Sequence, residues 1–167
     1  MTLVTYAFTA HVTFVYADPL PDLPALGDLV TGTLVYDPDP SHYASGASQF
    51  AQRSPGSGLF IQVDRWSFVP QPTPDTAQLI FGPEGSSGSS FNVFSVTETW
   101  VEGNMPNCYA VLQLQDPSAT VFHGLSLPAT LDLTKLTQGS GGGLIFKTFG
   151  TPHFEIDATL DTFVRRD

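Results

Sequence analysis

Charged side chains are scarce in this sequence, and most of those present carry one sign. Only 13% of the 167 residues are charged, where about 25% is usual for a soluble domain. Six Lys and Arg stand against 16 Asp and Glu, which gives a formal net charge of -10. Since such a field repels phosphate groups, we expect neither nucleic acid nor an anionic membrane surface as a partner.

Cysteine is nearly absent, and no long hydrophobic run occurs. The single cysteine, Cys108, cannot form a disulfide within the chain, so stability must come from packing, for which a chain of this length has enough residues. No stretch approaches the roughly 18 apolar residues of a helix that spans a bilayer, because Pro, Gly or polar residues interrupt each candidate. We therefore expect one domain, residues 1–167, without membrane insertion.

The composition favours a location outside the cytoplasm. Residues 1–5 lead into alternating sequence without the basic start and apolar run of a secretory signal. Ser, Thr, Gly and Gln are nevertheless common and Lys is rare, which is more typical of exported bacterial proteins than of cytosolic ones. We expect a secreted or periplasmic protein, with a cytoplasmic one as the open alternative.

Alternating apolar and polar residues near both ends of the chain predict two long half-buried strands. In the first, the apolar face consists of Tyr6, Phe8, Ala10, Val12, Phe14 and Tyr16. In the last, it consists of Phe154, Ile156, Ala158 and Leu160, with polar residues on the other face. Long strands at the two termini can pair with each other, as they do where a barrel closes.

Shorter strands fill the chain between these two. They are expected at residues 28–37, 59–69, 78–81, 91–100, 108–115, 120–123 and 144–149, separated by segments rich in Pro, Gly and Ser. Trp66 and Phe68 are out of phase with the start of the 59–69 strand, which suggests a bulge and leaves the facing of Asp64 open. No stretch has a sustained helical period. The prediction is an all-β fold, either an antiparallel β-sandwich of jelly-roll type or a closed β-barrel, with roughly nine strands and little helix.

Several short blocks resemble a common exported bacterial domain. Near the start these are YAFTAHVT at 6–13 and GDLVTGTLVYD at 27–37, and later LQLQDP at 112–117 and ATL at 158–160. Over nearly its whole length the chain is similar to the β-rich domain frequent in proteins with a PEP-CTERM sorting tail, although the Pro-Glu-Pro signature does not occur in it. The resemblance implies a β fold and a role at the cell surface or in exopolysaccharide, and it implies no catalytic residues.

Three potential metal ligands alternate at the start of the last strand. His153, Glu155 and Asp157 lie on one face at intervals of about 7 Å, and imidazole with carboxylates can bind a divalent ion or share acid–base work. His11 in the first strand would add a fourth ligand if it lay opposite. Ligands on one strand are too far apart to converge, and half-buried strands carry polar residues outward in any case. We therefore interpret the three as a solvated face rather than a metal site.

Nucleophile and phosphate-binding motifs are not found. The Gly- and Ser-rich stretch 85–89 lacks the Gly-x-Ser-x-Gly spacing, and Gly139–Gly143 lacks the ending of a phosphate loop. Cys108 alternates with apolar neighbours, which predicts a buried and inert thiol. We expect no catalytic residue and no cofactor, and the sequence leans against an enzyme without deciding the question.

Aromatic residues make up 12% of the chain and offer a different kind of site. Exposed rings stack on sugar faces when amide or carboxylate groups lie beside them. Trp66 beside Asp64, and Tyr109 beside Asn107 and Gln113, are candidate glycan platforms, with core packing as the competing interpretation. Tyr109 faces away from the apolar set of its strand and is the better candidate.

Two functions from different classes follow from these features. The favoured one is a non-catalytic binding or structural module outside the cytoplasm, directed toward polysaccharide. The alternative is a carrier, isomerase or cyclase that holds a small apolar ligand in a barrel interior. Its lining would be Phe8, Phe14, Leu34, Tyr36 and Leu112. A filled interior would favour the module.

Overall fold

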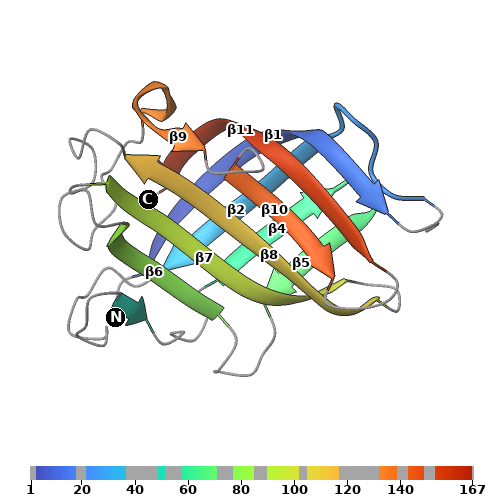
Figure 1. Cartoon of the computed structure of the whole chain (residues 1–167), viewed down its shortest axis with the longest axis horizontal. Helices are drawn as coiled ribbons and strands as arrows, with labels where there is room; N and C mark the ends of the chain where they lie inside the picture. Colours follow the sequence, from blue (N-terminus) through green and yellow to red (C-terminus); the bar gives the residue numbers. More distant parts are fainter. Residues whose placement is uncertain are drawn as a thin grey trace.

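The structure is a computed structural model, and the residues it describes form an antiparallel β fold (Figure 1). Described are residues 3–17, 22–36, 49–51, 58–70, 77–84, 90–101, 105–116, 132–138, 143–148 and 153–166. These ranges contain eleven strands, a short 3-10 helix at Leu133–Lys135 and no α-helix. The strands are β1 (Val4–Ala17), β2 (Leu29–Tyr36), β3 (Gln49–Ala51), β4 (Gly58–Val63), β5 (Trp66–Pro70), β6 (Ala77–Glu84), β7 (Ser90–Val101), β8 (Met105–Asp116), β9 (Thr137–Gln138), β10 (Gly143–Thr148) and β11 (Phe154–Arg166).

The all-β prediction is confirmed, and the expected strand count is too low. Two short strands, β3 and β9, were not expected, and the single strand predicted at 59–69 is two strands, β4 and β5. Short strands escape a search for alternation because two or three residues show no period.

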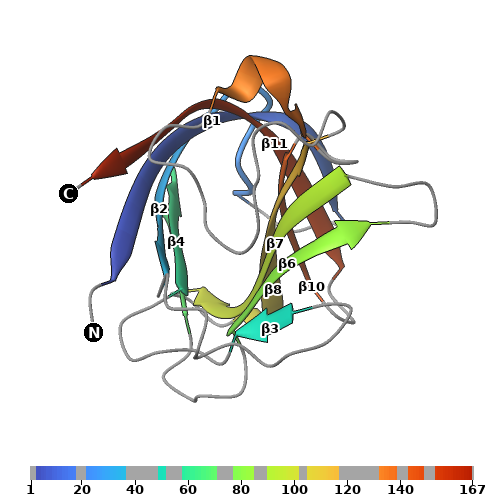
Figure 2. The same ribbon diagram turned by 90° about the vertical axis from the view of Figure 1, so that its left-hand side faces the viewer.

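One antiparallel sheet contains all eleven strands, in the order β3-β6-β7-β5-β4-β2-β1-β11-β10-β8-β9. β7 has neighbours along both edges, because β5 and β6 share one edge and β8 takes the other. Figure 2 shows β2 and β4 on one side of the molecule and β8 and β10 on the opposite side, with β1 and β11 running between them.

The terminal strands β1 and β11 pair with each other, as the sequence predicts. Their register runs from Thr5 opposite Arg166 to Ala17 opposite Phe154. Two extra residues interrupt it, Thr13 in β1 and Asp161 in β11. Each bulge reverses the facing of the side chains beyond it, since successive residues of a strand point to opposite faces.

The bulge at Thr13 corrects the predicted apolar face of the first strand. The residues before it, Tyr6, Phe8, Ala10 and Val12, are buried as expected. Beyond it, Phe14 is 47% exposed and Tyr16 is 51% exposed. The interior lining predicted for Phe14 is therefore wrong.

Residues 59–69 form a β-hairpin rather than one bulged strand. Val63 pairs with Trp66, so Asp64 and Arg65 make a two-residue loop. Asp64 has a φ of 49°, a left-handed conformation that Asp adopts more readily than most residues. This reversal explains why the apolar residues of β5 are out of phase with those of β4 although both sets face the core.

Side chains from strands that do not pair with each other meet in the core. The ring of Phe68 in β5 lies 4.7 Å from that of Phe146 in β10, and the ring of Trp66 in β5 lies 6.5 Å from that of Phe154 in β11. The indole N–H of Trp66 donates to the carbonyl oxygen of Asp22, in the loop between β1 and β2, at 3.0 Å. All four rings are buried, so this part of the core is packed from one side of the molecule to the other.

Some predictions concern residues outside those described. The strand at 120–123 and the glycine-rich segments 85–89 and 139–142 are among them, as are the side chains of Tyr36 and Cys108. Among the described residues, no helix is long and apolar enough to cross a membrane.

Close packing across β1 and β2 makes Gly32 hard to replace. Gly32 pairs with Phe8, and a Cβ at position 32 would meet the ring of Phe8 and lie 2.5 Å from the carbonyl oxygen of Phe60. We predict that Gly32→Ala lowers the free energy of unfolding by about 1–3 kcal/mol, the usual effect of overpacking, as measured by denaturant titration. Thr31→Ala, at the exposed neighbouring position, is the control and should change stability by less than about 0.5 kcal/mol. Equal stability of the two variants would contradict the packing.

Candidate functional site

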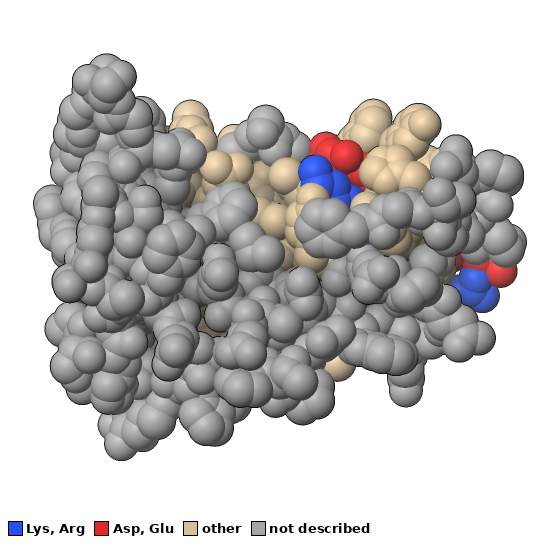
Figure 3. Space-filling model, turned by 60° about the horizontal axis from the view of Figure 1, so that its bottom comes forward, with Lys and Arg blue, Asp and Glu red and all other residues tan. Residues whose placement is uncertain are grey.

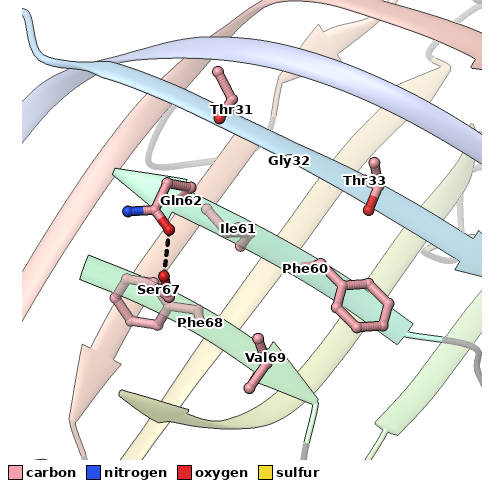
Figure 4. Close-up of a pocket in the computed structure, with 9 residues that line it drawn as sticks. All are labelled: Thr31, Gly32, Thr33, Phe60, Ile61, Gln62, Ser67, Phe68 and Val69. Atoms are coloured by element: carbon pink, nitrogen blue, oxygen red, sulfur yellow. Dashed lines mark hydrogen bonds between the residues drawn. The ribbon is translucent and has the colours of Figure 1, made fainter. Parts of the chain in front are cut away.

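An open groove lies on the outer surface of the sheet, across β2, β4 and β5 (Figure 4). Its volume is about 370 Å³. Three consecutive residues of each strand line it, Thr31–Thr33, Phe60–Gln62 and Ser67–Val69. The middle residue of each triplet faces the core, because side chains alternate along a strand. The outer two of each triplet supply the groove with its side chains.

Strand register fixes the arrangement of these side chains. Thr31 lies opposite Gln62, and Thr33 lies opposite Phe60. Gln62 in turn lies opposite Ser67 across the β4–β5 hairpin. The groove therefore depends on the pairing of three strands and on the tight turn that joins two of them.

The polar groups of the groove are uncharged and partly held in place. The Ser67 hydroxyl donates to Gln62 Oε1, and Gln62 Nε2 donates to the carbonyl oxygen of Asp64. An amide so fixed keeps one N–H and one lone pair available for a ligand. Within the described part of the chain, the hydroxyl groups of Thr31 and Thr33 make no hydrogen bond, so they too are available.

An aromatic ring and an aliphatic side chain complete the groove. Phe60 is half-buried at one end of the β4 triplet, and Val69 in β5 is 45% exposed. Figure 4 shows the Phe60 ring near Thr33 at one end of the groove, with Gln62, Ser67 and Thr31 at the other end. The groove thus combines a ring that can stack with neutral donors and acceptors around it.

The charged side chains that the structure describes lie outside this groove. None of the described residues that line it carries a charge, and Arg65 in the adjoining turn is paired with the carboxylate of Asp22 at 2.7 Å. Where described charged side chains are visible in Figure 3, basic and acidic ones lie side by side. The groove is therefore suited to a neutral ligand.

The predicted platform residue Tyr109 lies on the other side of the molecule, on the outer surface of β8. Tyr109 is half-buried and pairs with Lys147 in β10, whose Nζ lies 5.5 Å from the ring centroid. Lys147 pairs with Glu155 in β11, with 4.0 Å between Nζ and Oε2. Glu155 pairs with Tyr16 in β1. We call these four residues, Tyr109, Lys147, Glu155 and Tyr16, the cross-strand row.

The other predicted platform residues are distributed over both sides. Gln113 is half-buried on the same surface of β8 as Tyr109, and the side chain of Asn107 lies outside those described. Trp66 is only 9% exposed and packs in the core, whereas Asp64 is exposed in the β4–β5 turn. The two predicted platforms therefore lie on different sides of the molecule. The Trp66 ring is packed in the core, so it is not exposed for stacking.

Two of the three potential metal ligands, Glu155 and Asp157, lie on the outer surface of β11, and His153 immediately precedes that strand. His153 contacts the ring of Tyr16, with 5.7 Å between centroids. His11 lies opposite Thr159, and its Nδ1 is 2.8 Å from Asp161 Oδ1, so His11 is not a fourth ligand beside Glu155. Among the described residues, no group of three His, Cys, Asp or Glu is placed to hold a metal ion.

Asp157 stands out among the carboxylates of this surface. Its cross-strand neighbours are apolar, Phe14 in β1 and Ile145 in β10. Burial, followed by the charge of Glu155, raises the pKa of Asp157, while Lys147 lowers it by less. Asp157 Oδ1 is buried and has no hydrogen-bond partner among the described residues. Asp157 Oδ1 is therefore a buried acceptor to which no described residue donates.

Sequence reasoning did not identify the groove. Thr31 and Thr33 lie within the strand predicted at 28–37, and Phe60, Gln62 and Ser67 lie within the strand predicted at 59–69. Bringing the two sets together requires the register between β2 and β4, which alternation within one strand does not contain.

Comparisons with protein-family models, with curated proteins and with solved structures give no match. The functional conclusions therefore depend on the geometry and chemistry of the two outer surfaces.

We predict that Asp157→Asn stabilises the protein at neutral pH. Because the pKa of Asp157 is raised in the folded state, ionisation of this carboxyl opposes folding. The stability of the parent protein therefore falls as the pH rises from about 4, the ordinary range of a carboxyl, through the raised pKa. The variant should melt at a higher temperature than the parent at neutral pH, and the difference should shrink as the pH falls below about 4.

Asp161→Asn is the matched control, because the Asp161 carboxylate has a partner in His11. We expect no such gain for it in the same thermal melts. A gain for Asp157→Asn that stays constant down to about pH 3 would show that charge is not its cause.

Proposed function

We propose that this chain is a non-catalytic binding or structural module for a neutral polysaccharide, and that the groove across β2, β4 and β5 holds the sugar chain. The observation that carries the proposal is the Phe60 ring in a groove whose described polar groups are all uncharged. A sugar presents a face of C–H groups and a rim of hydroxyls. The ring supports stacking on the face, and Thr31, Thr33 and Gln62 can bond the rim.

The charge of the chain supports the choice of a neutral polymer. A net charge of -10 repels polyanions at long range, and none of the described residues that line the groove is a cation. As part of the same proposal, we place the protein outside the cytoplasm and relate it to the β-rich domains of PEP-CTERM proteins. The support for these two points is the composition and the sequence resemblance.

We infer in addition that eight strands close into a barrel, in the order β1-β2-β4-β5-β7-β8-β10-β11. The support is that each of these strands pairs with the next and that β11 pairs with β1. Closure leaves these eight strands without an unpaired edge, which protects a sheet from edge-to-edge association. It also gives the molecule an inner core and an outer surface.

The packed core weighs against the alternative, a carrier, isomerase or cyclase with an apolar ligand inside. Phe8, Leu34 and Leu112 do face inward and are at most 2% exposed. The rings of Phe68 in β5 and Phe146 in β10 are in contact across the core, although these strands do not pair. They leave no room for a ligand in this part of the core. The binding module is therefore the better supported of the two functions.

Hydrogen exchange tests the closure. If β5 and β7 pair as Phe68 opposite Val101 and Val69 opposite Trp100, amide protons of both segments should exchange far more slowly than that of Leu26 in the β1–β2 loop, because their opening requires global unfolding. Exchange of both segments as fast as that of Leu26 would show an open sheet.

A titration with neutral oligosaccharides tests the binding function. Six-unit β-1,3- and β-1,4-glucans and α-1,6-glucans are added, and the backbone amide resonances of Thr31, Thr33, Gln62 and Ser67 are followed by nuclear magnetic resonance. We expect shifts at these amides with at least one glucan, and roughly tenfold weaker binding for Phe60→Ala, the loss expected for one stacked ring.

Leu29→Ala is the matched control for that titration, since Leu29 is an exposed apolar residue of β2 outside the groove. It should bind as the parent does. Groove amides that do not respond to any of the three glucans would refute the proposed function.

A further inference from the structure

The outer surface opposite the groove carries a second set of groups suited to a sugar chain. Figures 1 and 2 agree that β8 and β10 lie on the side of the molecule away from β2 and β4, and that β1 and β11 run between the two sides. The cross-strand row runs over this surface, and its members alternate with core residues such as Ala110, Phe146 and Ile156. The two outer surfaces therefore face in different directions.

At the centre of the row lies an ion pair whose hydrogen-bonding capacity is not used up. The 4.0 Å between Lys147 Nζ and Glu155 Oε2 is too long for a hydrogen bond. Both side chains are 32% exposed, so they are held by neighbours and still reachable. A hydroxyl group between them can accept from the ammonium and donate to the carboxylate, as a bridging water would.

Aromatic rings lie at both ends of the row. Tyr16 is 51% exposed, and the ring of His153 supports it from one side. Tyr109 lies beside the ammonium of Lys147. From β8 to β1 the row crosses three strand spacings, about 14 Å, which is more than one sugar ring can cover. The row therefore fits a polymer rather than a monosaccharide.

A buried acceptor adjoins the row. Asp157 is two residues from Glu155 on the same face of β11, and among the described residues its Oδ1 finds no donor. A buried acceptor without a partner is costly unless something supplies a hydrogen. A ligand hydroxyl lying along the row can do so.

We propose that the cross-strand row is a second polysaccharide site, and that the protein cross-links two chains of a neutral polysaccharide, one held in the groove and one on the row. This inference rests on the proposed function. The chain's net charge and the carboxylates of Glu155 and Asp157 disfavour polyanions on this surface as well. Because the two sites lie on different sides of the molecule, they hold two chains rather than two parts of one.

The test measures binding and cross-linking separately. Binding is followed as retardation of the protein in native gels that contain hydroxyethylcellulose, laminarin or dextran, with polygalacturonate as the anionic comparison. Cross-linking is followed as the rise in low-shear viscosity when protein is added to the same polymers. The variants are Tyr16→Ala for the row, Phe60→Ala for the groove, both together, and Leu26→Ala as an exposed loop control.

We expect the parent protein and Leu26→Ala to be retarded by at least one neutral polymer and to raise its viscosity. Each single variant should still be retarded but should lose most of the viscosity increase, by about fivefold or more, and the double variant should lose both effects. Since Tyr16 is exposed, thermal melts should show that Tyr16→Ala still folds.

Each other outcome has a distinct meaning. Retardation of the parent without a viscosity increase, or an undiminished increase with Tyr16→Ala, overturns the second site and leaves the groove function standing. No retardation by any neutral polymer overturns both proposals. A parent that sediments as a dimer without polymer, and as a monomer after Tyr16→Ala, would show that this surface binds a second copy of the chain instead.

Discussion

The pairing of the first strand with the last, with its two bulges, is the constraint on which the rest of the structure depends. Each bulge reverses the facing of the residues beyond it. Phe163 therefore packs in the core against Phe8, whereas Phe14 and Tyr16 point outward. Local bonds hold the irregular register near Asp161, between His11 and Asp161 at 2.8 Å and between the hydroxyls of Thr9 and Thr162 at 2.7 Å. Without the bulge at Thr13, Tyr16 would point inward and the cross-strand row would end at Glu155.

Core and groove are two sides of the same three strands. The turn at Asp64 and Arg65 points the apolar residues of both β4 and β5 inward, and alternation then points Gln62 and Ser67 outward together. Trp66 secures this hairpin, because its ring packs against Phe154 and its N–H is bonded to Asp22 in another loop. A change in the core of this hairpin would therefore alter the groove without touching a groove residue.

The alternation of apolar and polar residues was enough to predict most of the strands. It also predicted the pairing of the two terminal strands and which of their residues are buried before the bulges. It also predicted the outward facing of Tyr109. The bulges were not predictable, since they are properties of a pair of strands and leave each sequence apparently regular. The hairpin at Asp64 was missed because Asp-Arg is not one of the dipeptides that mark tight turns. The groove needed the register between strands, which only the folded chain determines.

The two outer surfaces share a physical feature that folding alone does not account for. An exposed ring such as Tyr16 adds little to stability. The Asp157 carboxylate between Phe14 and Ile145 reduces stability, because its buried Oδ1 has no donor among the described residues. Residues that oppose local stability tend to collect where a protein meets its ligand, because selection for binding maintains them. In this chain Tyr16 lies on the row and Asp157 beside it. Across the molecule lies the neutral groove, where the hydroxyls of Thr31 and Thr33 make no hydrogen bond with any described residue. The proposed binding function would account for Tyr16 and Asp157 together, because a sugar face would cover the ring and a sugar hydroxyl would supply a hydrogen to the carboxylate.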